Sequence, residues 1–206
     1  MRRLALAMAA VLASCAAPRA EGGAGAPWHL VPGSFEPGGQ PDGNSVFLDA
    51  PGGLILVDTG RHPAHTQKLL AYARQRGRPI AAIVNTHWHL DHTSGNGAVR
   101  AAFPQAEVLA GTAVRGALAG FLARSREQAQ ARLDAGEVPE AREAEVRRFL
   151  ALMADPRPLL PTRPVTASGE TVLAGRPLQV NLAPHAATEG DVWLYDPASR
   201  TLVAGD

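Results

Sequence analysis

Four side chains of the kinds that bind metals lie close together directly after a short apolar run. They are His87, His89, Asp91 and His92. Residues 80–84 in front of them are apolar and partly β-branched, which is typical of a buried strand. If that strand continues to His89, then His87 and His89 point to the same side. Burying three imidazoles and a carboxylate beside a core costs free energy unless each group has a partner. A divalent cation can be the partner of all four.

Cysteine usage narrows the kind of metal site that this chain can form. Cys15 is the single cysteine, so no thiolate from the folded domain can bind a metal or act as a nucleophile, and no intrachain disulfide can form. Histidine and carboxylate ligands without sulfur suit zinc, with iron, manganese or cobalt as alternatives. We therefore expect one or two Zn²⁺ ions as the cofactor.

The N-terminus has the features of an export signal. Arg2 and Arg3 precede an apolar run over residues 4–13 that is too short to remain as a membrane span. Residues 12–15, Leu-Ala-Ser-Cys, resemble a bacterial lipoprotein signal, and Cys15 would then carry the lipid. The alternative is plain secretion with cleavage at nearby small residues. We expect an exported protein, periplasmic or membrane-anchored, that meets the membrane only through Cys15.

The rest of the chain divides into a tether and one domain. Residues 16–43 are rich in Gly, Pro and Ala and indicate a tether with an irregular lead-in, and the domain is expected over 44–206. A net charge of +1 gives no reason to expect a nucleic-acid partner. Alternation and turn residues predict an α/β sandwich of the following elements: strands over 45–48, 54–57, 80–84, 107–110, 165–180, 192–195 and 202–206, and helices over 64–76 and 97–103.

Residues 112–155 differ from their surroundings. They are rich in Ala, Arg and Glu, and Gly136 and Pro139 divide them into two predicted helices with apolar residues at helical spacing. A helical hairpin inserted into the α/β domain is the resulting prediction. We favour a solvated pair packed on the sheet edge, with a substrate lid as the alternative.

The spacing His-x-His-x-Asp-His after a strand resembles the signature of the metallo-β-lactamase superfamily, whose fold is an αββα sandwich. Residues 44–110 and 165–206 carry the likeness. The resemblance implies a first metal on His87 and His89 and a second on Asp91 and His92. It also implies that Asp58, in an Asp-Thr-Gly turn, orients a ligating histidine. Asp206, in the closing Gly-Asp, would bridge the two metals.

His185 is the remaining metal candidate implied by this family. The family expects a third ligand of the first metal here, and His-Ala-Ala-Thr replaces the usual spacing, so either a longer loop brings His185 to the metal or that metal lacks a ligand. We favour His185, and note a faint likeness to the quinoprotein relay system metallohydrolases. Because the family supplies a further histidine after the Gly-Asp strand, the domain is expected to be truncated at its C-terminus.

These features predict a zinc-dependent hydrolase. A metal-bound hydroxide would attack an ester, thioester, lactone or amide carbonyl of a small molecule, with Asp91 orienting the nucleophile or accepting its proton. The alternatives are a periplasmic β-lactamase, a mononuclear iron dioxygenase of the same fold, and a non-catalytic lipid-tethered metal-binding protein. The sequence identifies no protein partner.

Overall fold

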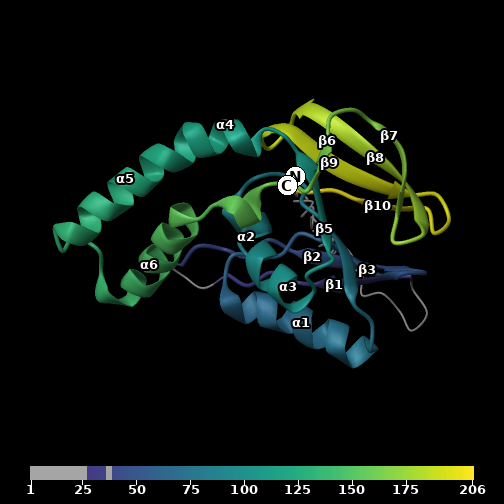
Figure 1. Ribbon diagram of the computed structural model, residues 1–206. Coiled ribbons are helices and arrows are strands. Elements are labelled where there is room, and N and C mark those ends of the chain that lie inside the picture. Colours follow the sequence, from purple (N-terminus) through teal and green to yellow (C-terminus); the bar gives the residue numbers. More distant parts are fainter. Residues whose placement is uncertain (1–26, 36–38) are drawn as a thin grey trace, which may run out of the picture.

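The structure is a computed structural model, and it describes residues 27–35 and 39–206. The expected signal segment, Cys15 and most of the tether lie outside the described residues. Two β-sheets face each other, with helices on one outer side (Figure 1). None of the helices in the described ranges is both long enough and apolar enough to span a bilayer.

The larger sheet has six strands in the order β1-β2-β3-β4-β5-β6. Its first three strands are antiparallel, with residues 32–44 between β1 and β2 and a tight turn between β2 and β3, whereas β3 to β6 run parallel because helices connect them. Every residue of β3 is buried, as expected for a parallel strand covered on both faces. The strands are β1 (Trp28–Val31), β2 (Ser45–Ala50), β3 (Gly53–Val57), β4 (Ile80–Val84), β5 (Glu107–Gly111) and β6 (Arg163–Val165).

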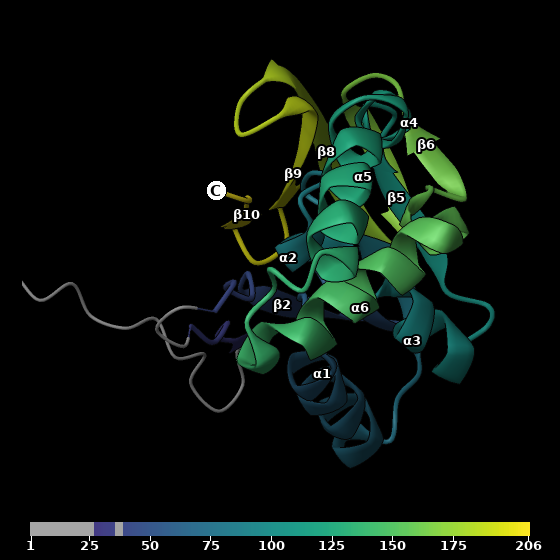
Figure 2. The same cartoon turned by 90° about the vertical axis from the view of Figure 1, so that its left-hand side faces the viewer.

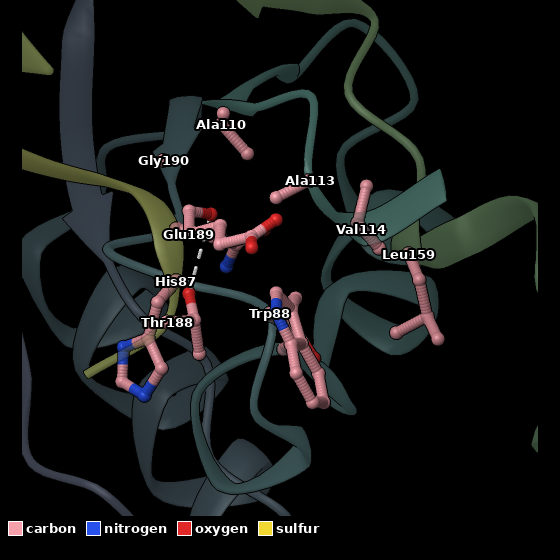
Figure 3. A pocket seen from close by; sticks show the side chains of 12 residues that line it. His87, Trp88, Ala110, Ala113, Val114, Leu159, Thr188, Glu189 and Gly190 are labelled. Carbon is pink, nitrogen blue, oxygen red and sulfur yellow. Dashed lines mark hydrogen bonds between the residues drawn. The ribbon is translucent and has the colours of Figure 1, made fainter. Parts of the chain in front are cut away.

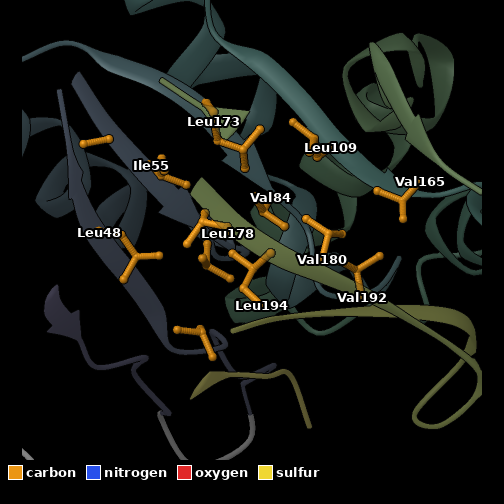
Figure 4. Close-up of a cluster of buried hydrophobic side chains, with 14 residues drawn as sticks. Leu48, Ile55, Val84, Leu109, Val165, Leu173, Leu178, Val180, Val192 and Leu194 are labelled. Carbon is orange, nitrogen blue, oxygen red and sulfur yellow. The ribbon is translucent and has the colours of Figure 1, made fainter. Parts of the chain in front are cut away.

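The smaller sheet is an antiparallel meander in the order β10-β9-β8-β7. Its apolar side chains meet those of the larger sheet in a buried layer, where Leu48, Ile55 and Val84 face Leu178, Val180 and Leu194 (Figure 4). Burying each such side chain contributes about 1.5–3 kcal/mol, so this layer is the main force holding the sheets together. The strands are β7 (Gly169–Leu173), β8 (Arg176–His185), β9 (Glu189–Asp196) and β10 (Thr201–Val203).

Helices α1 (Pro63–Arg76) and α3 (Asn96–Ala102) cover the outer face of the larger sheet. Leu69 and Leu70 of α1 and Val99 of α3 pack there against the sheet. Within the described ranges no helix covers the outer face of the smaller sheet, where Val172 and Leu202 are exposed. The α/β sandwich predicted from the sequence is therefore present, with one helical layer among the described residues.

Two segments differ from the sequence prediction. Trp28–Val31, inside the expected tether, forms the edge strand β1 by pairing with β2. The insertion contains three helices rather than two, α4 (Val114–Ala119), α5 (Phe121–Asp134) and α6 (Glu140–Ala154), because Gly120 adopts a non-helical conformation between the first two. These helices also do not lie flat on a sheet edge: α5 and α6 pair with each other and project beyond the sheets on the side of α2 (Leu90–Thr93) (Figure 1).

Candidate metal centre

The histidine-rich segment begins where β4 leaves the sheet. The strand predicted over residues 80–84 is confirmed as β4, which ends at Val84 and does not continue to His89. The backbone N–H of Thr86 donates to the Asp58 carboxylate (2.8 Å) instead of to a neighbouring strand. His89 then precedes the short helix α2, which carries Asp91 and His92. The side chains therefore meet through a loop and one helical turn rather than through strand alternation.

His87, His89 and Asp206 form one compact group of ligand atoms. The Nε2 atom of His87 lies 3.0 Å from Nδ1 of His89 and 3.9 Å from Oδ2 of Asp206. One ligand atom from each of the three lies within 4.8 Å of the other two. The His87 side chain is fully buried, whereas that of Asp206 is 61% exposed.

Asp91, His92 and Asp206 form a second group of the same size. Nε2 of His92 lies 3.5 Å from Oδ2 of Asp91 and 3.3 Å from Oδ1 of Asp206. This nitrogen is buried and has no hydrogen-bond partner. A buried polar atom without a partner is costly, and one aimed between two carboxylates marks the place of a cation.

Asp58 fixes the orientation of His92. One oxygen of its carboxylate accepts the Nδ1–H of His92 (2.7 Å), and both oxygens bind Thr86, through its backbone N–H (2.8 Å) and its hydroxyl (2.7 Å). Asp58 itself lies in the left-handed region at φ 59°, in the turn after β3. Because Nδ1 is engaged by Asp58, Nε2 of His92 is directed at Asp91 and Asp206.

The two buried imidazoles have opposite pKa shifts. Burial lowers the pKa of His87, and the neighbouring His92 lowers it further. Burial also lowers the pKa of His92, but the hydrogen bond and the charge of Asp58 outweigh it and raise the pKa overall. His87 is therefore held neutral, the state in which an imidazole binds a metal, while His92 shares its Nδ1 proton with a carboxylate.

Two glycines that sequence reasoning missed allow the backbone to approach these rings. A Cβ on Gly43 would lie 2.7 Å from Cε1 of His92, and a Cβ on Gly205 would lie 2.6 Å from Oγ1 of Thr86 and 3.1 Å from Nδ1 of His87. Any larger residue would displace the rings. The only signal in the sequence is that Gly43 precedes the first strand of the expected domain and Gly205 precedes Asp206.

Arg61 and Asp42 are also close to the centre and were not identified from the sequence. The Arg61 guanidinium lies 3.6 Å from Oδ1 of Asp91, and the Asp42 carboxylate accepts the backbone N–H groups of Arg61 (2.7 Å) and His62 (2.8 Å). Burial raises the pKa of Asp42, but these bonds outweigh it and lower the pKa. His65 is fully buried, and its Nε2 lies 2.9 Å from the hydroxyl of Ser45.

His185 does not join either group of ligand atoms. It ends β8, is exposed, and pairs with Glu189 across the hairpin. The Asp191 carboxylate accepts the N–H groups of Ala187 and Thr188 (3.0 Å each), and this closes a tight turn that holds His185 at its rim. Instead of His185, residues 188–190 lie beside His87, where they line a small pocket (Figure 3).

A large cavity of about 660 Å³ opens beside His89 and Asp91. It lies between the start of α1, α2, and the inserted helices α5 and α6, and a view along the inserted helices shows α6 above α1 (Figure 2). The insertion was predicted to be a solvated pair on the sheet edge. Most of its residues are exposed, but it projects beyond the sheets, and side chains of α5 and α6 form a wall of the cavity. The residues that line it include Arg61, Trp88, Leu90, Phe121, Val146 and Phe149.

Comparison with known proteins identifies the family. The sequence profile of the metallo-beta-lactamase superfamily matches residues 38–206. Among curated proteins, a linear primary-alkylsulfatase from a Pseudomonas strain is 30% identical over 78% of this chain and 32% of its own length. A hydroxyacylglutathione hydrolase from Acaryochloris marina is 40% identical over 32% of this chain and 28% of its own length. The chain thus spans about a third of these relatives.

Solved structures share the fold at low identity. A metallo-beta-lactamase family protein from Thermus thermophilus has a TM-score of 0.60, with 21% identity over 86% of this chain and 58% of its own. A metallo-beta-lactamase from Pontibacter korlensis has a TM-score of 0.54, with 18% identity over 85% of this chain and 64% of its own. The sec-alkylsulfatase Pisa1 from Pseudomonas has a TM-score of 0.51, with 21% identity over 76% of this chain and 27% of its own. At this level of identity these matches establish the architecture.

Proposed function

The chain belongs to the metallo-beta-lactamase superfamily, and on this basis we propose that it is a metal-dependent hydrolase of small-molecule esters or thioesters. One observation carries the proposal. The buried, unpartnered Nε2 of His92 is directed at two carboxylates that lie beside the His87–His89 pair. The names of the two curated relatives, a sulfatase and a thioester hydrolase, agree with a hydrolytic reaction.

The donor set fits a divalent cation. Imidazole nitrogens and carboxylate oxygens converge in two groups that share Asp206, and the single cysteine of the sequence lies far away in the chain. His87, His89 and Asp206 would hold one cation, and Asp91, His92 and Asp206 a second. Zinc suits these ligands, with iron or manganese as alternatives. When bound, such a cation lowers the pKa of water and stabilises negative charge on oxygen.

The protein's own groups position the reactants. Thr86 and Asp58 hold the ring of His92, and Arg61 restrains Asp91 from the side of the large cavity. Asp91 orients the attacking water and accepts its proton, which then passes to the leaving alcohol or thiol. The water oxygen ends on the acid fragment as the ester bond breaks. Arg61 also presents a guanidinium to an anionic part of the substrate.

Export remains a sequence-based proposal. We propose that the N-terminal segment directs the protein out of the cytoplasm and that Cys15 becomes lipidated. Labelling cells with radioactive palmitate should mark the wild-type protein but not Cys15→Ser. Label in both proteins would contradict the anchor, and an unlabelled wild-type protein in the soluble periplasmic fraction would indicate plain secretion.

The test of the hydrolase proposal compares His92→Ala with His29→Ala. The protein is stripped with EDTA and reloaded with Zn²⁺, its metal is measured by mass spectrometry, and turnover is followed on p-nitrophenyl acetate, a hydroxyacylglutathione, decyl sulfate and nitrocefin. We expect zinc-dependent turnover of an ester or thioester that His92→Ala abolishes. His29 stacks on Tyr72, away from the ligands, so His29→Ala should retain the activity.

Three other outcomes would overturn the hydrolase proposal. Cleavage of nitrocefin alone would replace the proposal with a β-lactamase. Less than one zinc per chain together with no turnover would favour a non-catalytic protein, and activity that persists in EDTA would exclude a metal-dependent mechanism.

A further inference from the structure

The cavity between α1, α2, α5 and α6 has an apolar wall. Its apolar lining comes from both inserted helices and from the segment that carries the ligands, with the residues Trp88, Leu90, Phe121, Leu122, Val146, Phe149 and Leu152. A cavity of about 660 Å³ lies within the range of small-molecule sites, about 300–1,000 Å³. Phe121 is 57% exposed at this wall, although an aromatic ring would normally be buried.

The cavity also has polar lining residues, which come from the metal centre, from α1, from α5 and from α6. His89, Asp91 and Arg61 line the same cavity as the apolar wall, and the Nε–H groups of Arg61 and Arg142 are buried without partners. Arg142 is otherwise paired with Glu145 (3.0 Å). The cavity therefore offers polar side chains to the polar part of a ligand and an apolar surface to the rest.

We propose that the α5–α6 hairpin selects the substrate class, an ester whose one side is a long, unbranched apolar chain. The chain would lie along Val146 and Phe149 while the scissile bond lies between Arg61 and the ligand residues. This inference rests on the proposed hydrolytic function. It replaces the solvated-pair interpretation of the insertion, because a merely solvated pair would not need apolar side chains around an open cavity beside His89 and Asp91.

A chain-length series tests the proposal. For the wild-type protein we expect kcat/KM on p-nitrophenyl decanoate to exceed that on p-nitrophenyl acetate by at least about tenfold, since each buried methylene adds selectivity. Val146→Trp narrows the cavity and should lower the ratio of the decanoate value to the acetate value by at least about tenfold. Ala151→Trp, on an exposed position of the same helix, is the matched control and should change neither value.

Decyl sulfate and the decanoate ester show on which side of the scissile bond the apolar chain of the substrate lies. Preferential turnover of decyl sulfate would assign the apolar chain to the alcohol side, and preferential turnover of p-nitrophenyl decanoate would assign it to the acyl side. Either result supports the proposal if Val146→Trp reduces it.

Binding separates this proposal from the hydrolase proposal. Sodium decanoate and sodium acetate are titrated calorimetrically into zinc-loaded and EDTA-treated protein. Decanoate should bind both forms, and Val146→Trp, but not Ala151→Trp, should weaken it. Binding without any turnover would retain the cavity assignment and overturn the hydrolase. Turnover that is equal on acetate and decanoate esters, with no decanoate binding, would overturn the cavity assignment and retain the hydrolase.

Discussion

The two halves of the candidate metal centre are built differently. His87 and His92, from the segment between β4 and α3, have side chains that are 0% and 3% exposed. Asp206, which follows β10, is 61% exposed, and His185 at the end of β8 is exposed as well. The histidine segment is thus part of the core, whereas the residues that follow β8 and β10 lie at the surface of this chain, whose last residue is Asp206. We call them the buried half and the exposed half.

Hydrogen bonds explain why the buried half is fixed. Asp58 holds Thr86 and His92, and Asn96 donates to Asn85 (2.7 Å) and accepts from Thr59 (2.9 Å) behind them. Buried hydrogen-bond networks of this kind make a single arrangement of the side chains more stable than its alternatives. We infer that the buried half is prearranged for a cation.

The largest expected effect concerns the Asp58 network. Asp58→Ala leaves Thr86 and His92 buried without their partner, so we expect the free energy of unfolding of the metal-free protein to fall by about 3–5 kcal/mol. Urea denaturation monitored by circular dichroism measures this. Asp206→Ala, at an exposed position, should change stability by less than about 0.5 kcal/mol. Equal losses in the two variants would show that the halves do not differ.

Gly43 tests how closely the buried half is packed. Gly43→Ala places a Cβ 2.7 Å from the His92 ring and should destabilise the protein by about 1–3 kcal/mol by overpacking. Zinc affinity should fall as well, because the ring must move. Gly116→Ala is the control, since a Cβ there meets nothing within 4 Å. A neutral Gly43→Ala would show that the His92 ring has room to shift.

The sequence predicted the buried half better than the exposed half. His87, His89, Asp91 and His92 are neighbours in the chain, so a local fold keeps them close, and the structure brings them together although β4 does not continue to His89. The apolar runs likewise predicted the two-sheet core. Local patterns are sufficient where neighbouring residues determine the arrangement.

Long-range contacts account for what the sequence could not show. The position of His185 depends on how Asp191 closes the hairpin. The nearness of Arg61 to Asp91 depends on the hydrogen bond that joins the turn after β3 to α2, from the N–H of Thr59 to the carbonyl of His92. The cavity depends on the angle at which α5 and α6 leave the sheets. None of these features has a periodic signature in the sequence, because each is set by residues far apart in the chain.

Asp206 tests the exposed half through metal binding rather than stability. Because it is the one residue common to both groups of ligand atoms, Asp206→Ala should weaken zinc binding by at least about tenfold. Competition with a chromophoric chelator measures the affinity. An unchanged affinity would mean that the buried half alone holds the metal.

Asp196 tests how the smaller sheet is attached to the larger one. Burial raises its pKa, but hydrogen bonds from Arg176 and Ser199 outweigh it and lower the pKa below the ordinary 3.8. Arg176 also donates to the backbone of Asp49 in β2, so this pair links the sheets. A depressed folded pKa stabilises the protein above the unfolded pKa and ceases to do so as pH falls through the folded pKa.

The prediction for Asp196→Asn follows from the lowered pKa of Asp196 in the folded protein. The melting temperature of the variant should lie below that of the wild type at pH 7, and the difference should shrink at pH 3 and below, where the wild-type carboxyl takes up its proton. Thermal melts across this range test it, and acids common to both proteins, such as Asp42, cancel in the difference. A difference in melting temperature that stays constant down to pH 2 would show that the charge of Asp196 does not stabilise the fold.

Substitution of His185 has the smallest expected effect on zinc affinity. It tests whether the exposed half of the centre contains a further ligand. Since its side chain is exposed at the rim of the hairpin and outside both groups of ligand atoms, His185→Ala should leave zinc affinity within about threefold of the wild type, well short of the loss from removing a residue that supports a metal. The same chelator competition provides the comparison with Asp206→Ala. If His185→Ala instead loses as much affinity as Asp206→Ala, the hairpin must close on the metal, and the exposed half contains a ligand that moves into place on binding.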